Sequence, residues 1–109
     1  MFRQFYFIMM VYSLSYELKT ADKDYTPLFS FLEKGIGKGG IHVLRDSWWI
    51  ASDKKLNITK TCEDIRKFLG DKDHIFLTEL SNTNTNGWLP SSSWNWFKEH
   101  NNTTNNLLY

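Results

Sequence analysis

Leu-Arg-Asp-Ser-Trp-Trp-Ile, residues 44–50, is the stretch that decides the fold of this chain. The apolar residues on either side of the central Arg-Asp-Ser alternate with a period of two, so they predict two short strands that meet at a tight turn. The hairpin lies between two segments of helical periodicity, and a further strand is predicted at each outer end. The predicted order is therefore strand, helix, strand, strand, helix, strand.

The two outer strands are predicted by the same alternation. In residues 7–18 one set of alternating positions is uniformly large, and the other becomes small and polar. This pattern is typical of a central strand that is covered on one side. Residues 74–80 form the last predicted strand, with Phe76 and Leu80 on one face and Ile75 and Leu77 on the other.

Two helices are predicted between these strands. Thr26 acts as a cap with Pro27 at the first helical position, and Thr61 with Asp64 three residues later forms a capping box at the start of the second helix, which ends at Gly70. The apolar stripes consist of Tyr25, Leu28, Phe29, Leu32 and Ile36 in the first helix and of Cys62, Ile65, Phe68 and Leu69 in the second. Because both stripes need a sheet to cover them, we expect an α+β domain with two helices on one face of a four-stranded antiparallel sheet, the ferredoxin-like βαββαβ arrangement.

The chain changes character after residue 80. Turn-forming residues lead to a segment that contains Trp88, Trp94 and Trp96, and a polar tail follows. We expect the tryptophans to pack on the open face of the sheet or on a second subunit, because so many indoles are rarely exposed together. The predicted organisation is one domain over residues 1–100, with a core at about 9–80, a Trp-rich extension at 81–100 and a tail at 101–109.

Composition narrows the function classes. The 109 residues carry a net charge of +1. The net charge therefore gives no sign of a nucleic-acid-binding or cation-binding protein. Cys62 is the one cysteine, so it forms no internal disulfide, which favours a reducing, cytoplasmic location. The apolar start of the chain is too short to span a membrane, and Met1, Met9 and Met10 are alternative start residues.

Three stretches, residues 11–18, 46–50 and 73–80, resemble strand signatures of the small CRISPR-associated ferredoxin-fold endonuclease-like proteins. The similarity is to the SinR-like branch and, more distantly, to the virulence-associated protein D toxins. It implies a homodimer in which the first strands bring together one acidic residue from each subunit, which binds Mg²⁺ or Mn²⁺ and supports phosphodiester cleavage. Glu17 stands at that position, where the family usually has aspartate, and Ser47 matches its turn serine.

Each of these residues also has an ordinary structural interpretation. Glu17 is equally an exposed carboxylate at a strand end, and Ser47 a turn residue that caps the backbone. The glycine-rich segment at residues 35–40 follows a helix instead of opening one, so it lacks the geometry of a phosphate-binding loop.

Local positive charge provides the remaining functional signal. The predicted nucleic-acid-binding residues are Lys34, Lys38, Arg45, Lys54 and Lys55. If these share a face they form a footprint for a phosphate backbone, and the alternative is a solvated rim with interspersed acids. Together with this charge, the resemblance implies a nucleic-acid-binding homodimer that acts as a metal-dependent RNase or DNase. The alternative is a catalytically inactive dimeric module that holds a protein partner with its Trp-rich end.

Overall fold

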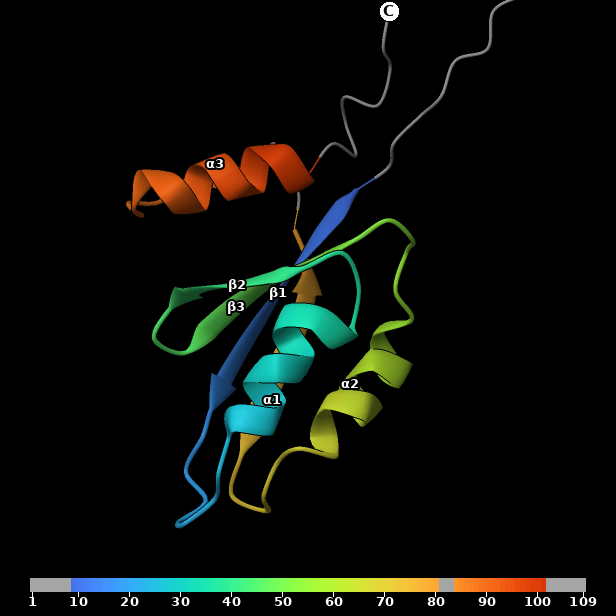
Figure 1. Cartoon of the computed structure of the whole chain (residues 1–109), viewed down its shortest axis with the longest axis vertical. Helices are drawn as coiled ribbons and strands as arrows, with labels where there is room; N and C mark the ends of the chain where they lie inside the picture. The colour runs from blue at the N-terminus through green and yellow to red at the C-terminus, as the bar shows by residue number, and fades with distance from the viewer. Residues whose placement is uncertain (1–8, 81–83, 102–109) are drawn as a thin grey trace, which may run out of the picture.

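A four-stranded sheet with helices on both faces forms the body of the protein (Figure 1). The computed structural model describes residues 9–80 and 84–101. The elements are, in chain order, β1 (Met10–Glu17), α1 (Thr26–Ser30), η1 (Phe31–Gly35), β2 (Gly40–Leu44), β3 (Ser47–Ser52), α2 (Ile58–Arg66), β4 (His74–Glu79) and α3 (Ser91–His100). η1 is a π-helical turn that continues α1 without a break.

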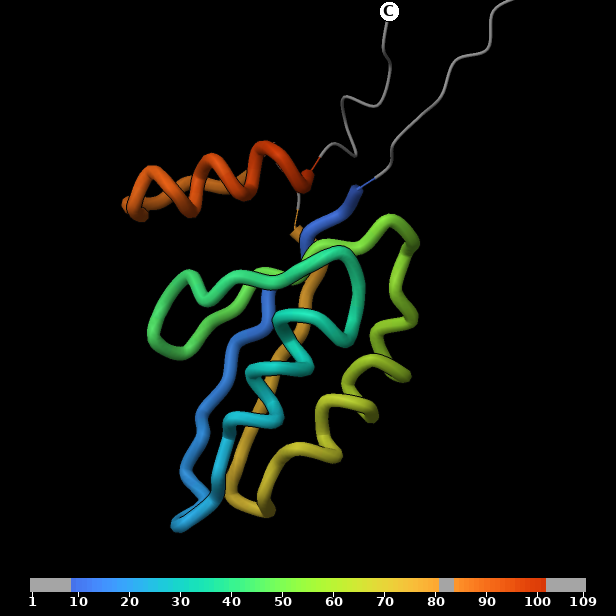
Figure 2. The backbone as a smooth tube through the Cα atoms, in the orientation of Figure 1, coloured from blue at the N-terminus to red at the C-terminus, as the bar shows by residue number. Residues whose placement is uncertain are grey.

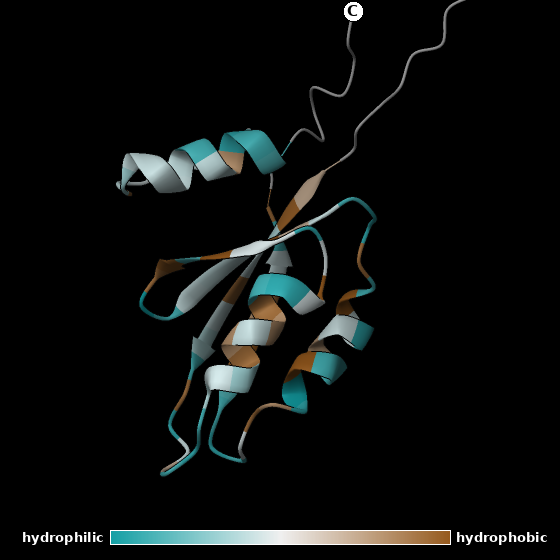
Figure 3. Ribbon diagram, viewed as in Figure 1, coloured by the Kyte–Doolittle hydropathy of each residue, from teal (hydrophilic) through white to brown (hydrophobic). Residues whose placement is uncertain are grey.

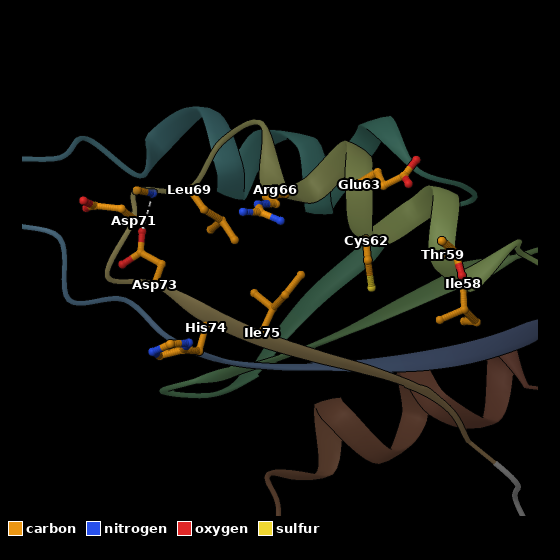
Figure 4. Close-up of a pocket in the computed structure, with 11 residues that line it drawn as sticks. Ile58, Thr59, Cys62, Glu63, Arg66, Leu69, Asp71, Asp73, His74 and Ile75 are labelled. Carbon is orange, nitrogen blue, oxygen red and sulfur yellow. Dashed lines mark hydrogen bonds between the residues drawn. The ribbon is translucent and has the colours of Figure 1, made fainter.

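The strands lie in the order β2-β3-β1-β4, and every neighbouring pair is antiparallel. Counted from the other edge, this is β4-β1-β3-β2, which is consistent with the ferredoxin-like fold and confirms the predicted α+β class. α1 and α2 lie on one face of the sheet, and α3 lies on the opposite face (Figures 1 and 4). No helix in residues 9–80 or 84–101 is long and apolar enough to cross a membrane.

The hydrophobic core lies between the sheet and the first two helices. Alternate residues of β1, including Tyr12 and Leu14, contact Leu28 and Leu32 of the first helix and Ile65 of the second in one cluster. Tyr12 is fully buried, and its hydroxyl accepts a hydrogen bond from the Leu56 N–H at 2.9 Å. The hairpin turn is hydrophilic, and so are parts of the exposed faces of the helices (Figure 3).

Both helix starts differ from the prediction. Thr26 is the first residue of α1 instead of its cap, and its N–H donates to Asp24 Oδ1 at 2.9 Å. α2 begins at Ile58, three residues before Thr61, because Asn57 is the N-cap and its Oδ1 accepts the Lys60 N–H at 3.0 Å. Asparagine is among the strongest N-cap residues, so this cap overrides the weaker Thr-Asp signal.

Candidate functional site

The face of the sheet opposite α1 and α2 is divided into a covered half and an uncovered half. α3 covers one half, because the Trp49 ring lies 5.1 Å from the Phe97 ring, 6.1 Å from Trp94 and 6.4 Å from Trp96, measured between centroids. Of the two expected arrangements for this segment, its aromatic side chains pack on the open sheet, while a contact with a second subunit stays a prediction. Of the three tryptophans predicted for a partner surface, Trp94 and Trp96 contact their own chain, whereas Trp88 is 100% exposed.

Glu17 and Ser47 lie together on the uncovered half. Ser15 of β1 is directly opposite Ser47 of β3, and Glu17 is two residues further along β1, opposite His74 of β4. Residues at such positions share one face of a sheet. Phe76, opposite Ser15, is 70% exposed, so nothing in the described chain covers this half.

Glu17 is an accessible carboxylate at the end of β1. Its closest charged neighbour is Lys19, with Nζ 3.5 Å from Glu17 Oε2, and both side chains are well exposed. Among the residues that the structure describes, no group of three or more His, Cys, Asp or Glu side chains is arranged to hold a metal ion. A Mg²⁺ ion at Glu17 would take its other oxygen ligands from water, a second chain or a bound phosphate.

The structure brings part of the predicted basic set to one end of the sheet. The Lys38 N–H donates to the Ala51 carbonyl at 2.8 Å, and Lys38 Nζ lies 3.6 Å from Asp53, so the loop before β2 lies beside the loop after β3. Gly37 makes this contact possible, because a Cβ there would collide with the Ala51 carbonyl oxygen. Lys54 and Lys55 are in that second loop, and both are exposed.

The other two predicted nucleic-acid-binding residues are Lys34 and Arg45. Lys34 lies at the same end of the sheet as Lys38, and Arg45 does not. Lys34 is exposed in η1, four residues before Lys38. Arg45 lies in the β2–β3 turn, so the whole length of β2 separates it from the lysines. The Arg45 carbonyl lies 3.0 Å from His42 Nε2 and accepts a bond from the Tyr16 hydroxyl at 3.4 Å. Burial raises the pKa of Tyr16, which therefore stays neutral at physiological pH.

Asp73 is a polar centre that the sequence analysis did not identify. It accepts the backbone N–H groups of Lys19 at 2.7 Å, Thr20 at 3.1 Å and Gly70 at 2.7 Å, together with the Tyr25 hydroxyl. Partial burial works to raise the pKa of Asp73, but these hydrogen bonds outweigh it and hold the pKa well below its usual range. The acceptor sites of this carboxylate are thus largely occupied, and its role is to join loops that lie side by side at one end of the molecule (Figure 2).

A groove of about 850 Å³ runs between α2 and β4, the edge strand of the sheet. Ile58 and Cys62 point from the helix toward the strand, Ile75 points from the strand toward the helix, and Arg66 lies above Ile75 (Figure 4). Cys62 was predicted to be a core residue and is partly buried, and desolvation raises the pKa of its thiol. The groove was not predicted, since it needs the helix and strand to be placed relative to each other.

Comparisons with models of protein families, with curated proteins and with solved structures give no match to this chain.

Proposed function

We propose that the protein is a cytoplasmic homodimer that binds the phosphate backbone of RNA or DNA. The observation that supports this most directly is the packing of the Lys38 loop against the end of β3, next to Lys54 and Lys55. With Lys34, four exposed ammonium groups are available at this end, and of these only Lys38 has an ion pair within the described residues. Ammonium groups without partners gain affinity by displacing the counterions of a phosphate backbone.

Salt dependence provides the test of backbone binding. Fluorescence anisotropy with labelled single-stranded RNA, single-stranded DNA and duplex DNA is measured from 50 to 300 mM KCl. Four phosphate contacts predict a slope of log affinity against log salt of about −3 for a single strand. An affinity that does not change with salt would refute the proposal, and the comparison of the three probes identifies the preferred nucleic acid.

A matched pair of double variants locates the binding surface. Lys54→Glu/Lys55→Glu removes two of the four proposed contacts. The slope of log affinity against log salt should become less steep by about 1.4, and binding should weaken at least tenfold. Lys23→Glu/Lys72→Glu makes the same change in net charge at the other end of the molecule and should bind almost as the wild type does. Equal losses in both variants would indicate a general charge effect and count against the lysine end.

Metal-dependent cleavage at Glu17 is the second candidate function, and the shared face of Glu17 and Ser47 favours it. Mg²⁺ or Mn²⁺, when bound, supplies charge stabilisation for the phosphate, and it is commonly held by one or two carboxylates together with substrate phosphates. In this proposal Glu17 is the protein ligand, and Ser47 positions the phosphate by a hydrogen bond.

Cleavage is tested on gels with the same nucleic acids, comparing wild type with Glu17→Gln and with Glu99→Gln as a matched control on α3. Cutting that needs metal, is lost in Glu17→Gln and persists in Glu99→Gln supports this second candidate. Binding without cutting leaves the nucleic-acid-binding proposal intact and removes the nuclease. Neither binding nor cutting would favour the catalytically inactive interaction module.

A further inference from the structure

β4 presents an unused row of backbone hydrogen-bonding groups. The Leu80 N–H donates to the Val11 carbonyl at 2.9 Å. In an antiparallel pair such residues alternate, so His74, Phe76 and Thr78 also direct their backbone N–H and C=O groups toward β1. The intervening residues, Ile75, Leu77 and Glu79, direct theirs outward. β4 is the last strand of the sheet, and within residues 9–80 and 84–101 these outward groups have no partner.

The groove beside this edge has a different chemistry at each end. α2 runs opposite to β4, so Ile58 and Cys62 lie toward the end of the strand, and Arg66 lies near its beginning, above Ile75 (Figure 4). Glu63 also lies on the groove wall, and Asp71 and His74 lie at its beginning. The side chains that face β4 near its end, Ile58 and Cys62, are thus apolar, whereas near the start of β4 the Arg66 guanidinium lines the groove together with Asp71, Asp73 and His74.

Two opposite charges along this edge are available for a partner. Arg66 and Glu79 are both exposed, and neither makes an ion pair within the part of the chain that the structure describes. Arg66 lines the groove above Ile75, and Glu79 is the last residue of β4, four residues further along the strand. Glu79 shares the helix-facing side of β4 with Ile75 and Leu77, since residues two apart point to the same face.

We infer that β4 of a second copy of this chain pairs antiparallel with β4 about a two-fold axis at Leu77, which joins two sheets into one of eight strands. In this register Leu77 faces its own copy and Ile75 faces Glu79 of the second copy. The pairing forms about six backbone hydrogen bonds between the strands. Because a two-fold axis repeats each contact, every favourable pair counts twice.

Charge and apolar complementarity support this antiparallel arrangement. Glu79 of the second copy arrives opposite Ile75, directly below Arg66, and Ile75 of the second copy arrives at the apolar end beside Ile58 and Cys62. A parallel strand of the same sequence would instead bring Glu79 to the apolar end and leave Arg66 without a carboxylate. A carboxylate paired with Arg66 on this edge gives the interface its direction as well as its affinity.

This inference rests on the proposal that the protein acts as a homodimer, and it specifies the interface. It also has a consequence for Glu17, which lies opposite His74, three residues from the axis at Leu77. The two Glu17 carboxylates of such a dimer are separated by about 20 Å along the strands. Each would therefore act alone in the cleavage candidate, without the shared pair that the family resemblance implies.

The interface is tested by sedimentation equilibrium of the full chain from 1 to 200 µM, with five variants beside the wild type. Glu79→Pro removes an outward N–H and a charge, and Glu79→Arg and Arg66→Glu each place like charges opposite each other. All three should raise the dimer dissociation constant at least tenfold. The double variant Glu79→Arg/Arg66→Glu restores opposite charges and should return the constant to within about threefold of wild type. Glu99→Arg, a matched charge reversal on α3, should have no effect.

Hydrogen exchange provides a measurement that does not depend on a variant folding. The amides of Ile75, Leu77 and Glu79 should exchange rapidly at low protein concentration and become protected as the dimer forms. A monomer at 200 µM would overturn the inference, and so would a dimer in which these amides stay unprotected or the charge swap fails to restore association. Nucleic-acid binding is scored separately with Lys54→Glu/Lys55→Glu, so loss of the dimer and failure of the proposed function remain distinguishable.

Discussion

The Tyr25 hydroxyl lies 2.7 and 2.8 Å from the two carboxylate oxygens of Asp73, although 48 positions separate these residues in the sequence. Tyr25 precedes α1 and Asp73 precedes β4, so the contact joins the loop after β1 to the loop after α2. Both loops lie at the same end of the molecule (Figure 2). The pair therefore holds the β1–α1 connection against the β4 edge of the sheet.

Replacing Asp73 by alanine should lower the free energy of unfolding by about 1.5–3 kcal/mol, because the donors that now bond to a charged acceptor lose it. Tyr25→Phe removes one of these bonds and should cost about 1 kcal/mol. Urea denaturation followed by tryptophan fluorescence measures both. Asp71→Ala, at a neighbouring exposed position, is the control and should change stability by less than about 0.5 kcal/mol. A similar small change in Asp73→Ala would contradict the prediction.

The depressed pKa of Asp73 also predicts a pH dependence. A carboxyl group whose pKa is lower in the folded state contributes stability above its unfolded pKa, and this stability is lost as the pH falls toward the folded pKa. The wild type should therefore lose stability below about pH 4, where an unperturbed aspartate becomes protonated. Asp73→Asn should be less stable at pH 6 and show a shallower loss from pH 5 to 2. Parallel stability curves for the two proteins would argue against this role for Asp73.

Gly37→Ala should destabilise the protein by about 1–3 kcal/mol, since the new Cβ collides with the Ala51 carbonyl and forces the backbone apart. The same shift separates Lys38 from the Lys54 loop, so nucleic-acid affinity should fall as well. Gly87→Ala is the matched control, because its Cβ would meet Trp94 only at an ordinary contact distance of 4.0 Å. Thermal unfolding and anisotropy measure the two effects, and equal behaviour of the two alanine variants would contradict the packing argument.

Phe97→Ala should loosen α3 from the sheet. Phe97 is 5% exposed against Trp49, and truncation of a buried aromatic side chain typically costs about 3–5 kcal/mol. Protease resistance of the C-terminal segment and urea denaturation report the loss. Trp88→Ala removes an even larger aromatic group from a fully exposed position and should leave stability within about 0.5 kcal/mol of wild type. If Phe97→Ala were equally harmless, α3 would not be held by this contact.

The strands were predictable because strand periodicity is a local property. The alternation in residues 44–50 and 74–80 was enough to identify β3 and β4 and, with the two apolar helical stripes, to predict the ferredoxin-like arrangement. The helix starts were less accurate, since Asn57 and Thr61 are both acceptable cap residues in the sequence. In the structure the stronger cap, Asn57, starts the helix, and Thr61 is a buried residue of its first turn.

The candidate sites were harder to predict from the sequence than the strands and helices, because they depend on the tertiary structure. Glu17 and Ser47 share a face because β1 and β3 are neighbours in a particular register, and a shift of one residue would have placed them on opposite faces. The Lys38 loop lies beside the loop that contains Asp53 and Lys54, and Arg45 lies apart from both because the length of β2 separates it from them. The Asp73 contacts and the groove beside β4 arise between segments that are distant in sequence.

Periodicity and turn chemistry depend only on neighbours along the chain, so the amino-acid sequence alone established the four strands and the two helices of the core, their order and the class of the fold. The partners of each exposed charge depend on strand register, on which half of the sheet α3 covers and on which strand lies at the edge. Those relationships are set by the burial of the whole core at once, because hydrophobic burial acts between segments regardless of their distance in sequence. The tertiary structure therefore decided that Phe97 packs on Trp49, that Tyr25 bonds to Asp73 and that β4 is an edge strand.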